Sequence, residues 1–364
     1  MELTQINYDR PAYHTQTQTI FKVYGKKNVI ANSIRLIDLK LNLDTPSNFN
    51  SFCGVYGVLK EVILKIGGRE VNKYNAPELY TLILNNTSHE VINDLDSVLF
   101  GNSGIYFDAG NALYYKSVVV DANSQSIYLN NLLKYLGSTD YINKDIEIII
   151  TWNTSLDFVS SVVASMNIDP PYLSYETVNT DVIGKSVVDF YNYIRDMVSV
   201  PAQTSVGTQE LNIRITSLNN KFIKRLFIIE QLQDDAGAGK YYSASMKGEV
   251  YNISVDGTNI LTFKNTSSDA VKNSMLVDAG VNLCGYPNCF TNSAANPVYK
   301  NPDQPLNGVL SYGCVELDRA VNKQINLNYR RTTSNDIFGS ALFIILIAEV
   351  LMRDDGESSK YLLV

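Results

Sequence analysis

Histidine is almost absent from this chain: its 364 residues include two, His14 and His89, which lie far apart. Tryptophan occurs once, as Trp152, within an apolar strand-like segment. Two isolated imidazoles leave little material for a histidine triad or a histidine metal site. A single tryptophan in an apolar pattern does not indicate the aromatic platform of a sugar-binding protein.

Cysteine is also scarce, and its spacing does not match a metal motif. Cys53 and Cys314 are isolated, whereas Cys284 and Cys289 have four residues between them. A structural zinc site needs four ligands, and no second Cys or His pair accompanies this one. A local disulfide is one alternative; we expect buried free thiols.

An excess of positive charge and a long apolar segment are both missing. The chain has 30 basic and 37 acidic residues, for a net charge of −7. Phosphate binding needs clustered Lys and Arg, so we expect no direct contact with nucleic acid. The first ten residues, MELTQINYDR, lack the pattern of an export signal. The longest apolar run, 341–352, contains Glu349 and is shorter than a membrane helix of about 20 residues. We expect it to be a buried strand.

Alternation of apolar and polar residues is the strongest pattern that is present, and it predicts β-strands. The segments DIEIIITW, ELNIRIT and QINLNYR each place their apolar side chains on one face. In SIRLIDLKLNL the alternation changes phase between Leu36 and Ile37, which predicts a β-bulge. The abundance of tyrosine, with 24 residues, also favours strands.

Three segments predict short helices between the strands. In 75–86, Asn75 and Glu78 have the spacing of a capping box. Apolar residues recur at helical spacing in 124–137, which ends at a glycine, and in 184–200. We therefore predict an all-β fold with a few short inserted helices.

The chain carries one hairpin pattern twice, which suggests a duplicated fold. Adding 189 to the positions of the apolar triplet Val62, Leu64 and Ile66 gives Tyr251, Ile253 and Val255. The same offset carries the Gly67–Gly68 turn to Asp256–Gly257 and the helix after the first hairpin to 265–275. Further along, Ile146 matches Ile325 at an offset of 179. Two unrelated β-domains are the alternative. Many short strands in each half predict two tandem eight-stranded jelly-roll β-sandwiches.

Motifs that could carry chemistry are incomplete. The segment DDAGAGK, 234–240, lacks the spacing of a phosphate-binding loop, and NDLDS, 93–97, lacks the twelve-residue calcium pattern. Asp-Ala-Gly occurs within 107–111 and 277–281, where we expect turns. We predict no catalytic, cofactor-binding or metal-binding residues and no cofactor.

Four stretches together resemble the double jelly-roll major capsid proteins of tailless icosahedral viruses. HTQTQTIFKVYGKKNVIANSIRLIDLKLNL resembles the polar lead-in and first strands, and GVLKEVILKIGGREVNKYNAPELYTL the hairpin and inserted helix. LNNLLKYLGSTDYINKDIEIIITW and INLNYRRTTSNDIFGSALFIILIAEVLMR resemble the closing strands of the two rolls. Within that family, the chain looks most like the proteins of small lipid-containing bacteriophages.

The resemblance implies a structural protein and not an enzyme. It implies a homotrimer that forms a pseudo-hexameric capsomer in a virion shell assembled in the host cytoplasm. Its partners would be neighbouring capsomers, minor capsid or penton proteins, and an internal membrane at the base. The expected domains are an N-terminal arm (1–14), a first roll (15–165), a linker (166–184), a second roll (185–352) and a C-terminal tail (353–364).

Two other classes of function remain open at the level of sequence. One is another virion protein, such as a penton, spike or receptor-binding protein. The other is a glycan-acting enzyme or lectin built from paired jelly rolls, with carboxylates at the interface. A stable trimer or shell favours the capsid protein, whereas a monomer that cleaves a glycan favours the enzyme.

Overall fold

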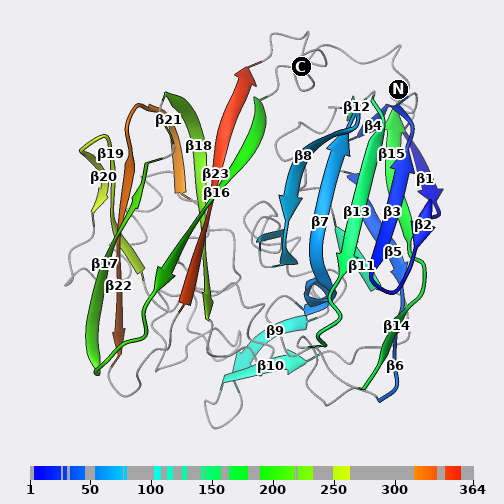
Figure 1. The fold of residues 1–364 in the computed structure, drawn as a ribbon, viewed down its shortest axis with the longest axis horizontal. Coiled ribbons are helices and arrows are strands. Elements are labelled where there is room, and N and C mark those ends of the chain that lie inside the picture. The colour runs from blue at the N-terminus through cyan, green and yellow to red at the C-terminus, as the bar shows by residue number, and fades with distance from the viewer. Residues whose placement is uncertain are drawn as a thin grey trace.

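Two β-sandwiches, one from each half of the chain, lie side by side along the long axis of the computed structural model (Figure 1). The structure describes residues 4–25, 28–30, 33–45, 54–76, 78–79, 102–107, 113–117, 125–128, 141–142, 144–156, 164–178, 189–216, 218, 220–232, 249–262, 315–333 and 341–353.

Two sheets form the first sandwich. In one sheet the strand order is β1 (Thr4–Asp9), β15 (Tyr172–Val178), β5 (Arg35–Leu39) and β11 (Gln125–Tyr128); β4 (Val29–Ile30) also pairs with β15, and β12 (Tyr141–Ile142) pairs with β4. In the other sheet the order is β2 (Tyr13–His14), β3 (Gln18–Val23), β13 (Ile146–Trp152), β7 (Leu59–Ile66) and β8 (Arg69–Tyr74). The remaining elements are the 3₁₀-helix η3 (Gly54–Val58), the ribbon of β9 (Asn102–Phe107) with β10 (Leu113–Ser117), and the ribbon of β6 (Leu41–Leu43) with β14 (Met166–Ile168).

Two four-stranded sheets form the second sandwich. One has the order β16 (Asp189–Val200), β23 (Ala341–Arg353), β18 (Lys221–Leu232) and β21 (Val315–Val321). The other has the order β17 (Gly207–Ile215), β22 (Ile325–Thr333), β19 (Glu249–Val255) and β20 (Thr258–Thr262). Buried residues of both sheets form one core cluster, as expected of a sandwich.

The two sandwiches have the same topology. If the eight strands β16 to β23 are counted in chain order, the sheets are 1-8-3-6 and 2-7-4-5. Counting β1, β3, β5, β7, β8, β11, β13 and β15 in the same way gives the same two orders. Eight strands in two sheets connected in this order form a jelly roll. The fold is therefore all-β with two tandem jelly rolls, as the sequence predicted.

The strand registers confirm the duplication residue by residue. In the first roll Leu64 pairs with Ile148, which also pairs with Phe21. In the second roll the matching positions are Ile253, Leu327 and Ile213, which pair in the same way. The offset of 189 on β7 and β19 and the offset of 179 on β13 and β22 thus relate equivalent strands. The two apolar triplets lie on these equivalent strands, as predicted.

The turns of the repeated hairpin are also equivalent. Gly67 and Gly68 have φ of 56° and 82°, and Asp256 and Gly257 have φ of 51° and 86°. Positive φ at both central residues defines the turn that matches the twist of two antiparallel strands. In each roll the first turn residue donates its N–H to the turn before the seventh strand: Gly67 to Asp145 O at 2.8 Å, and Asp256 to Gln324 O at 3.0 Å.

The predicted alternation corresponds to burial in both cores. On β13 every second side chain is buried, and Ile148 is fully inaccessible, as is Leu327 on β22. The predicted bulge lies on β5, where the four residues from Leu36 to Leu39 oppose three, 125–127, on β11. Asp38 has φ of 56° there, which brings Leu36 and Leu39 to the same buried side.

Two of the predicted helices are wrong in the described residues. Residues 189–200 form β16, which pairs with β23 along its whole length, and residues 125–128 form β11. Segment 184–200 contains four valines and two tyrosines, which favour strands, and a partner strand of 13 residues decides the outcome. The run 341–352 is a strand, as predicted.

Two segments that we expected outside the rolls contribute strands to the first one. Segment 1–14 contains β1 and β2, and segment 166–184 contains β15, which pairs with both β1 and β5. On β15, Leu173, Ser174 and Tyr175 are all buried, so this segment lacks a regular alternation of apolar and polar residues, and no side chain described on β1 is buried. The other domain boundaries stay a prediction.

Several expectations fall outside the described residues. They concern the cysteines, His89, the helix at 265–275, the rest of the segments 75–86 and 124–137, the motifs 93–97, 234–240 and 277–281, and the end of 107–111.

Candidate functional site: the joint between the two rolls

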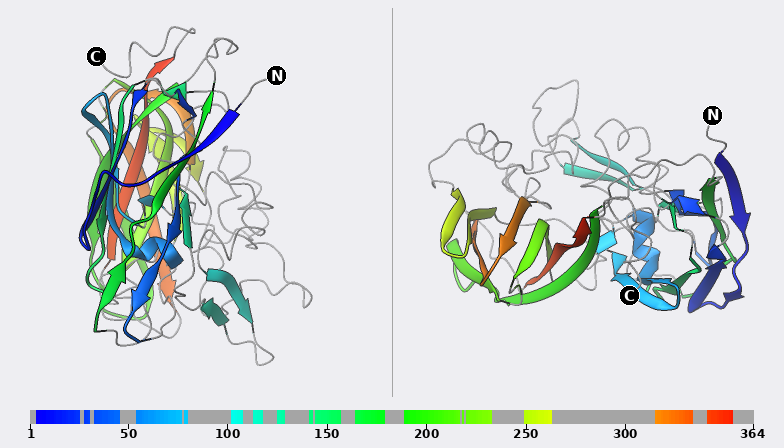
Figure 2. Two further views of the ribbon diagram at one scale, coloured as in Figure 1. Left: turned by 90° about the vertical axis from the view of Figure 1, so that its right-hand side faces the viewer. Right: turned by 90° about the horizontal axis from the view of Figure 1, so that it is seen from above.

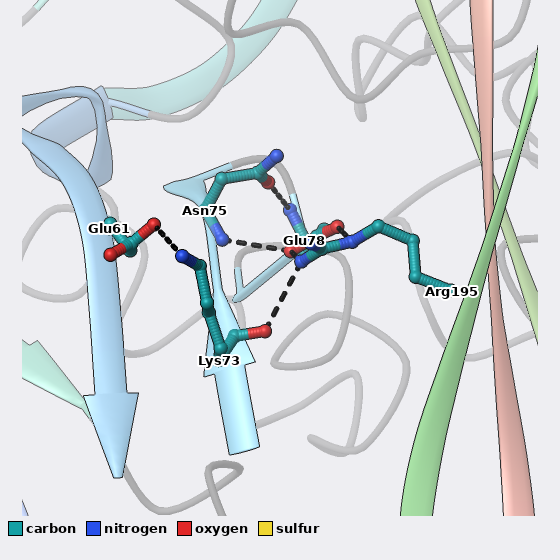
Figure 3. Close-up of polar contacts among 5 residues, drawn as sticks. All are labelled: Glu61, Lys73, Asn75, Glu78 and Arg195. Carbon is teal, nitrogen blue, oxygen red and sulfur yellow. Dashed lines mark hydrogen bonds and ion pairs between the residues drawn. The ribbon is translucent and has the colours of Figure 1, made fainter. Parts of the chain in front are cut away.

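The rolls meet where the end of β8 faces β16, and a buried carboxylate lies at this joint (Figure 3). Glu78 belongs to the helical turn that follows β8, and its side chain has no solvent exposure. Its backbone N–H donates to Asn75 Oδ1 at 3.0 Å, and Asn75 N–H donates to Glu78 Oε2 at 2.8 Å. This reciprocal pair is the predicted capping box, and it fixes the direction of the Glu78 side chain.

Arg195 reaches the carboxylate from β16 of the second roll. Its Nε donates to Glu78 Oε1 at 2.6 Å, and its Nη2 donates to Glu78 Oε2 at 2.5 Å. Nη2 also donates to the backbone oxygen of Lys73 at 3.2 Å. The planar guanidinium thus binds both carboxylate oxygens in parallel, the strongest geometry for this pair.

The surroundings of the pair explain its electrostatics. Burial raises the pKa of Glu78, and the hydrogen bonds and charge of Arg195 oppose that rise. Burial also raises the pKa of Tyr74, with the Glu78 charge as the next cause. At the surface nearby, Lys73 Nζ lies 2.6 Å from Glu61 Oε2, which ties β8 to β7.

The geometry of this joint suits a structural role, in which the pair of Glu78 and Arg195 holds the two rolls together. Both oxygens of Glu78 accept hydrogen bonds from within the chain, and Arg195 connects a turn of the first roll to a strand of the second. A buried carboxylate held this way resists separation of the rolls, because separation removes its partner. The capping box revealed Asn75 and Glu78 in the sequence. Arg195 is 117 positions from Glu78, and no local pattern reveals it.

The histidine and tryptophan noted in the sequence form a second polar connection, inside the first roll. Trp152 Nε1 donates to Thr19 Oγ1 at 2.8 Å, and Thr19 Oγ1 lies 2.8 Å from His14 Nδ1. His14 Nε2 lies 2.9 Å from the backbone oxygen of Ile168. In the neutral tautomer with hydrogen on Nε2, Thr19 donates to His14 and His14 donates to Ile168. The chain of bonds holds β2 and β14 against the core.

Two other kinds of site are missing from the described part of the chain. Those residues contain no group of three or more His, Cys, Asp and Glu side chains that could hold a metal ion. Nor do they contain a helix long and apolar enough to cross a membrane.

Comparison with known proteins gives similarity in structure only. No family model matches the sequence, and no curated protein is similar to it. The 3.5 Å cryo-EM structure of the Sputnik virophage contains a similar chain, with a TM-score of 0.57 and 12% identity over 99% of this chain and 90% of that one. A chain of the PBCV-1 virus capsid model has a TM-score of 0.53 and 12% identity, over 96% and 94%. The crystal structure of the STIV MCP has a TM-score of 0.51 and 10% identity, over 98% and 99%.

Each match spans both rolls and nearly the whole of the other chain. The resemblance to double jelly-roll proteins inferred from sequence is therefore confirmed for the fold. Identities of 10–12% are too low to transfer more than the fold.

Proposed function

We propose that this chain is the major capsid protein of an icosahedral virus, with a structural and not an enzymatic role. The observation that carries the proposal is the pairing of two complete jelly rolls of one topology, side by side in one chain. The chains that match across both rolls come from virus structures, including the PBCV-1 virus capsid.

The geometry explains why such a chain suits a shell. Three copies of a two-roll chain supply six similar wedges, which can close into a ring with nearly sixfold shape. A ring of this kind tiles a surface, and closed symmetry requires complementary side faces. The bidentate joint at Arg195 would keep the two wedges of each copy in a fixed relation.

The partners follow from this role. We propose a homotrimer that acts as a pseudo-hexameric capsomer and contacts neighbouring capsomers and minor capsid or penton proteins. The virion shell is its location, after assembly in the host cytoplasm. The net charge of −7 does not suit a protein that coats the genome, and we propose that the shell meets an internal membrane at its base.

Electron microscopy of the purified protein tests the proposal. We expect averaged end-on projections with six lobes and threefold symmetry, alone or within shells. Single particles with two lobes at every concentration, also in the presence of the other virion proteins, would contradict it. Reproducible glycan hydrolysis by such monomers would instead favour the enzyme.

A further inference from the structure

The two ends of the molecule present different strands. Figure 1 and the top view in Figure 2 place β1 and β2 at one end of the long axis and β19 and β20 at the other. In the middle, β16 of the second roll faces the β8 side of the first roll. The chain therefore contains one roll-to-roll joint, and its ends carry the strands for another.

Topology makes β1 the counterpart of β16. Each is the first strand of its roll and pairs with the last one, β15 or β23. Likewise β8 and β20 are the fifth strands, each paired in the sheet with the fourth, β7 or β19. In the joint inside the chain, β16, the first strand of the second roll, faces the side of the first roll that carries its fifth strand, β8. A joint of the same kind between two copies would bring β1 of one copy to the side of the second roll that carries β20 in the other copy.

In the joint inside the chain, the outward side of the first strand, β16, carries the contact. On β16 the outward residues include Arg195, which binds Glu78, and the exposed Met197. On β1, Asn7 and Asp9 lie opposite the buried Tyr175 and Leu173, so Ile6 and Tyr8 are on the outward side.

Ile6 and Tyr8 are more exposed than a monomer needs. Their side chains are 48% and 57% exposed, and Tyr13 on the neighbouring β2 is 52% exposed. Large apolar side chains along an edge strand promote association unless another surface covers them. Three of them at one end of the molecule mark a contact surface.

We propose that the outward face of β1, with Ile6, Tyr8 and Tyr13 of β2, binds the β20 side of the second roll of another copy. This rests on the proposed function, because it names the contact that closes the trimer. The contact is head-to-tail: each copy uses its β1 end and its β20 end once. Three such contacts alternate with three internal joints and close the six rolls into a ring.

Cross-linking tests which surfaces meet. Tyr8→Cys and Asn259→Cys, on β1 and β20, are combined in one chain and treated with a flexible bismaleimide. The unchanged chain, with its own four cysteines, sets the background. We expect covalent dimers and trimers from the double variant and from neither single variant. Cross-linked dimers from Tyr8→Cys alone would mean that β1 meets β1, and would overturn the proposal.

A second variant measures the strength of the contact. Replacing both Ile6 and Tyr8 by Thr keeps strand propensity and removes apolar area, so the dissociation constant of the trimer should rise by about tenfold or more. Val206→Thr is the matched control, because Val206 is also 48% exposed but lies in the turn before β17.

Unchanged melting of the dissociated double variant shows that the roll itself is intact. A trimer that forms as tightly as wild type without cross-linking at β1 overturns this contact and leaves the proposed function standing. A wild-type chain that stays monomeric contradicts both.

Discussion

Replacing Arg195 with Ala should weaken the first roll although Arg195 belongs to the second. The change removes both donors to the Glu78 carboxylate, which has no solvent exposure. Asn75 N–H still donates to one oxygen, at 2.8 Å. The variant therefore leaves a buried charge with part of its hydrogen bonding, at the point where the two rolls meet.

The size of the effect follows from the burial of the pair. Removing one partner of a buried ion pair costs about 3–5 kcal/mol. The Arg195 side chain is 32% exposed, and Asn75 remains in place, so we expect the lower end, about 3 kcal/mol. With a urea m-value of about 2 kcal/mol/M, the midpoint should fall by about 1.5 M.

The effect should depend on pH in a defined direction. Burial raises the pKa of Glu78 and Arg195 opposes that rise, so the variant has a still higher pKa. A raised pKa in the folded state means that folding takes up a proton. The stability associated with Glu78 is then present at low pH and is lost as pH rises through the folded-state pKa. Arg195→Ala should therefore cost less at about pH 5 than at about pH 7.

Trp152 provides the assay, because it is the single tryptophan and lies on β13 of the first roll. Its fluorescence follows the first roll during urea unfolding, while circular dichroism follows both rolls. Arg214→Ala, at an exposed position of β17, is the control and should leave both transitions in place. If Arg195→Ala leaves the Trp152 transition unchanged at neutral pH, the joint does not couple the rolls and the reasoning is wrong.

Four further substitutions test the rolls themselves. Ile148→Ala and Leu327→Ala should each cost about 2–5 kcal/mol in thermal or urea unfolding, since both residues are fully buried; near-wild-type melting of both would refute the inward faces. Thr19→Val leaves the buried Trp152 Nε1–H without its acceptor and should lower the free energy of unfolding by about 1–3 kcal/mol, as followed by Trp152 fluorescence. An unchanged unfolding midpoint would show that this hydrogen bond does not stabilise the roll. Asp256 accepts N–H donors from 322–324, which lower its pKa, so its contribution is present above its unfolded pKa and lost as pH falls. Asp256→Asn should melt below wild type at about pH 6, and the difference should vanish in acid; a gap that persists there would contradict this.

The sequence alone was sufficient to predict features that depend on the alternation of residues within one strand. Alternation placed Ile148 and Leu327 in the two cores, and the offset of 189 identified equivalent hairpins, because burial in a sandwich has a period of two. The capping box was readable because both partners, Asn75 and Glu78, lie within one turn.

The rest depended on partners far away in the chain. Segment 184–200 has apolar residues at helical spacing, but β23, more than 140 positions later, pairs with it as a strand. On β1 the apolar Ile6 and Tyr8 face outward, so its pattern shows no core. The partner of Glu78 comes from the other roll, and neither periodicity nor composition carries that information.

The mass of the purified assembly tests the central claim most directly. Native mass spectrometry or mass photometry should find a stable particle of three 40.6 kDa chains, or shells built from such particles. A particle of one chain at all concentrations, also with the other virion proteins present, would contradict the capsid assignment.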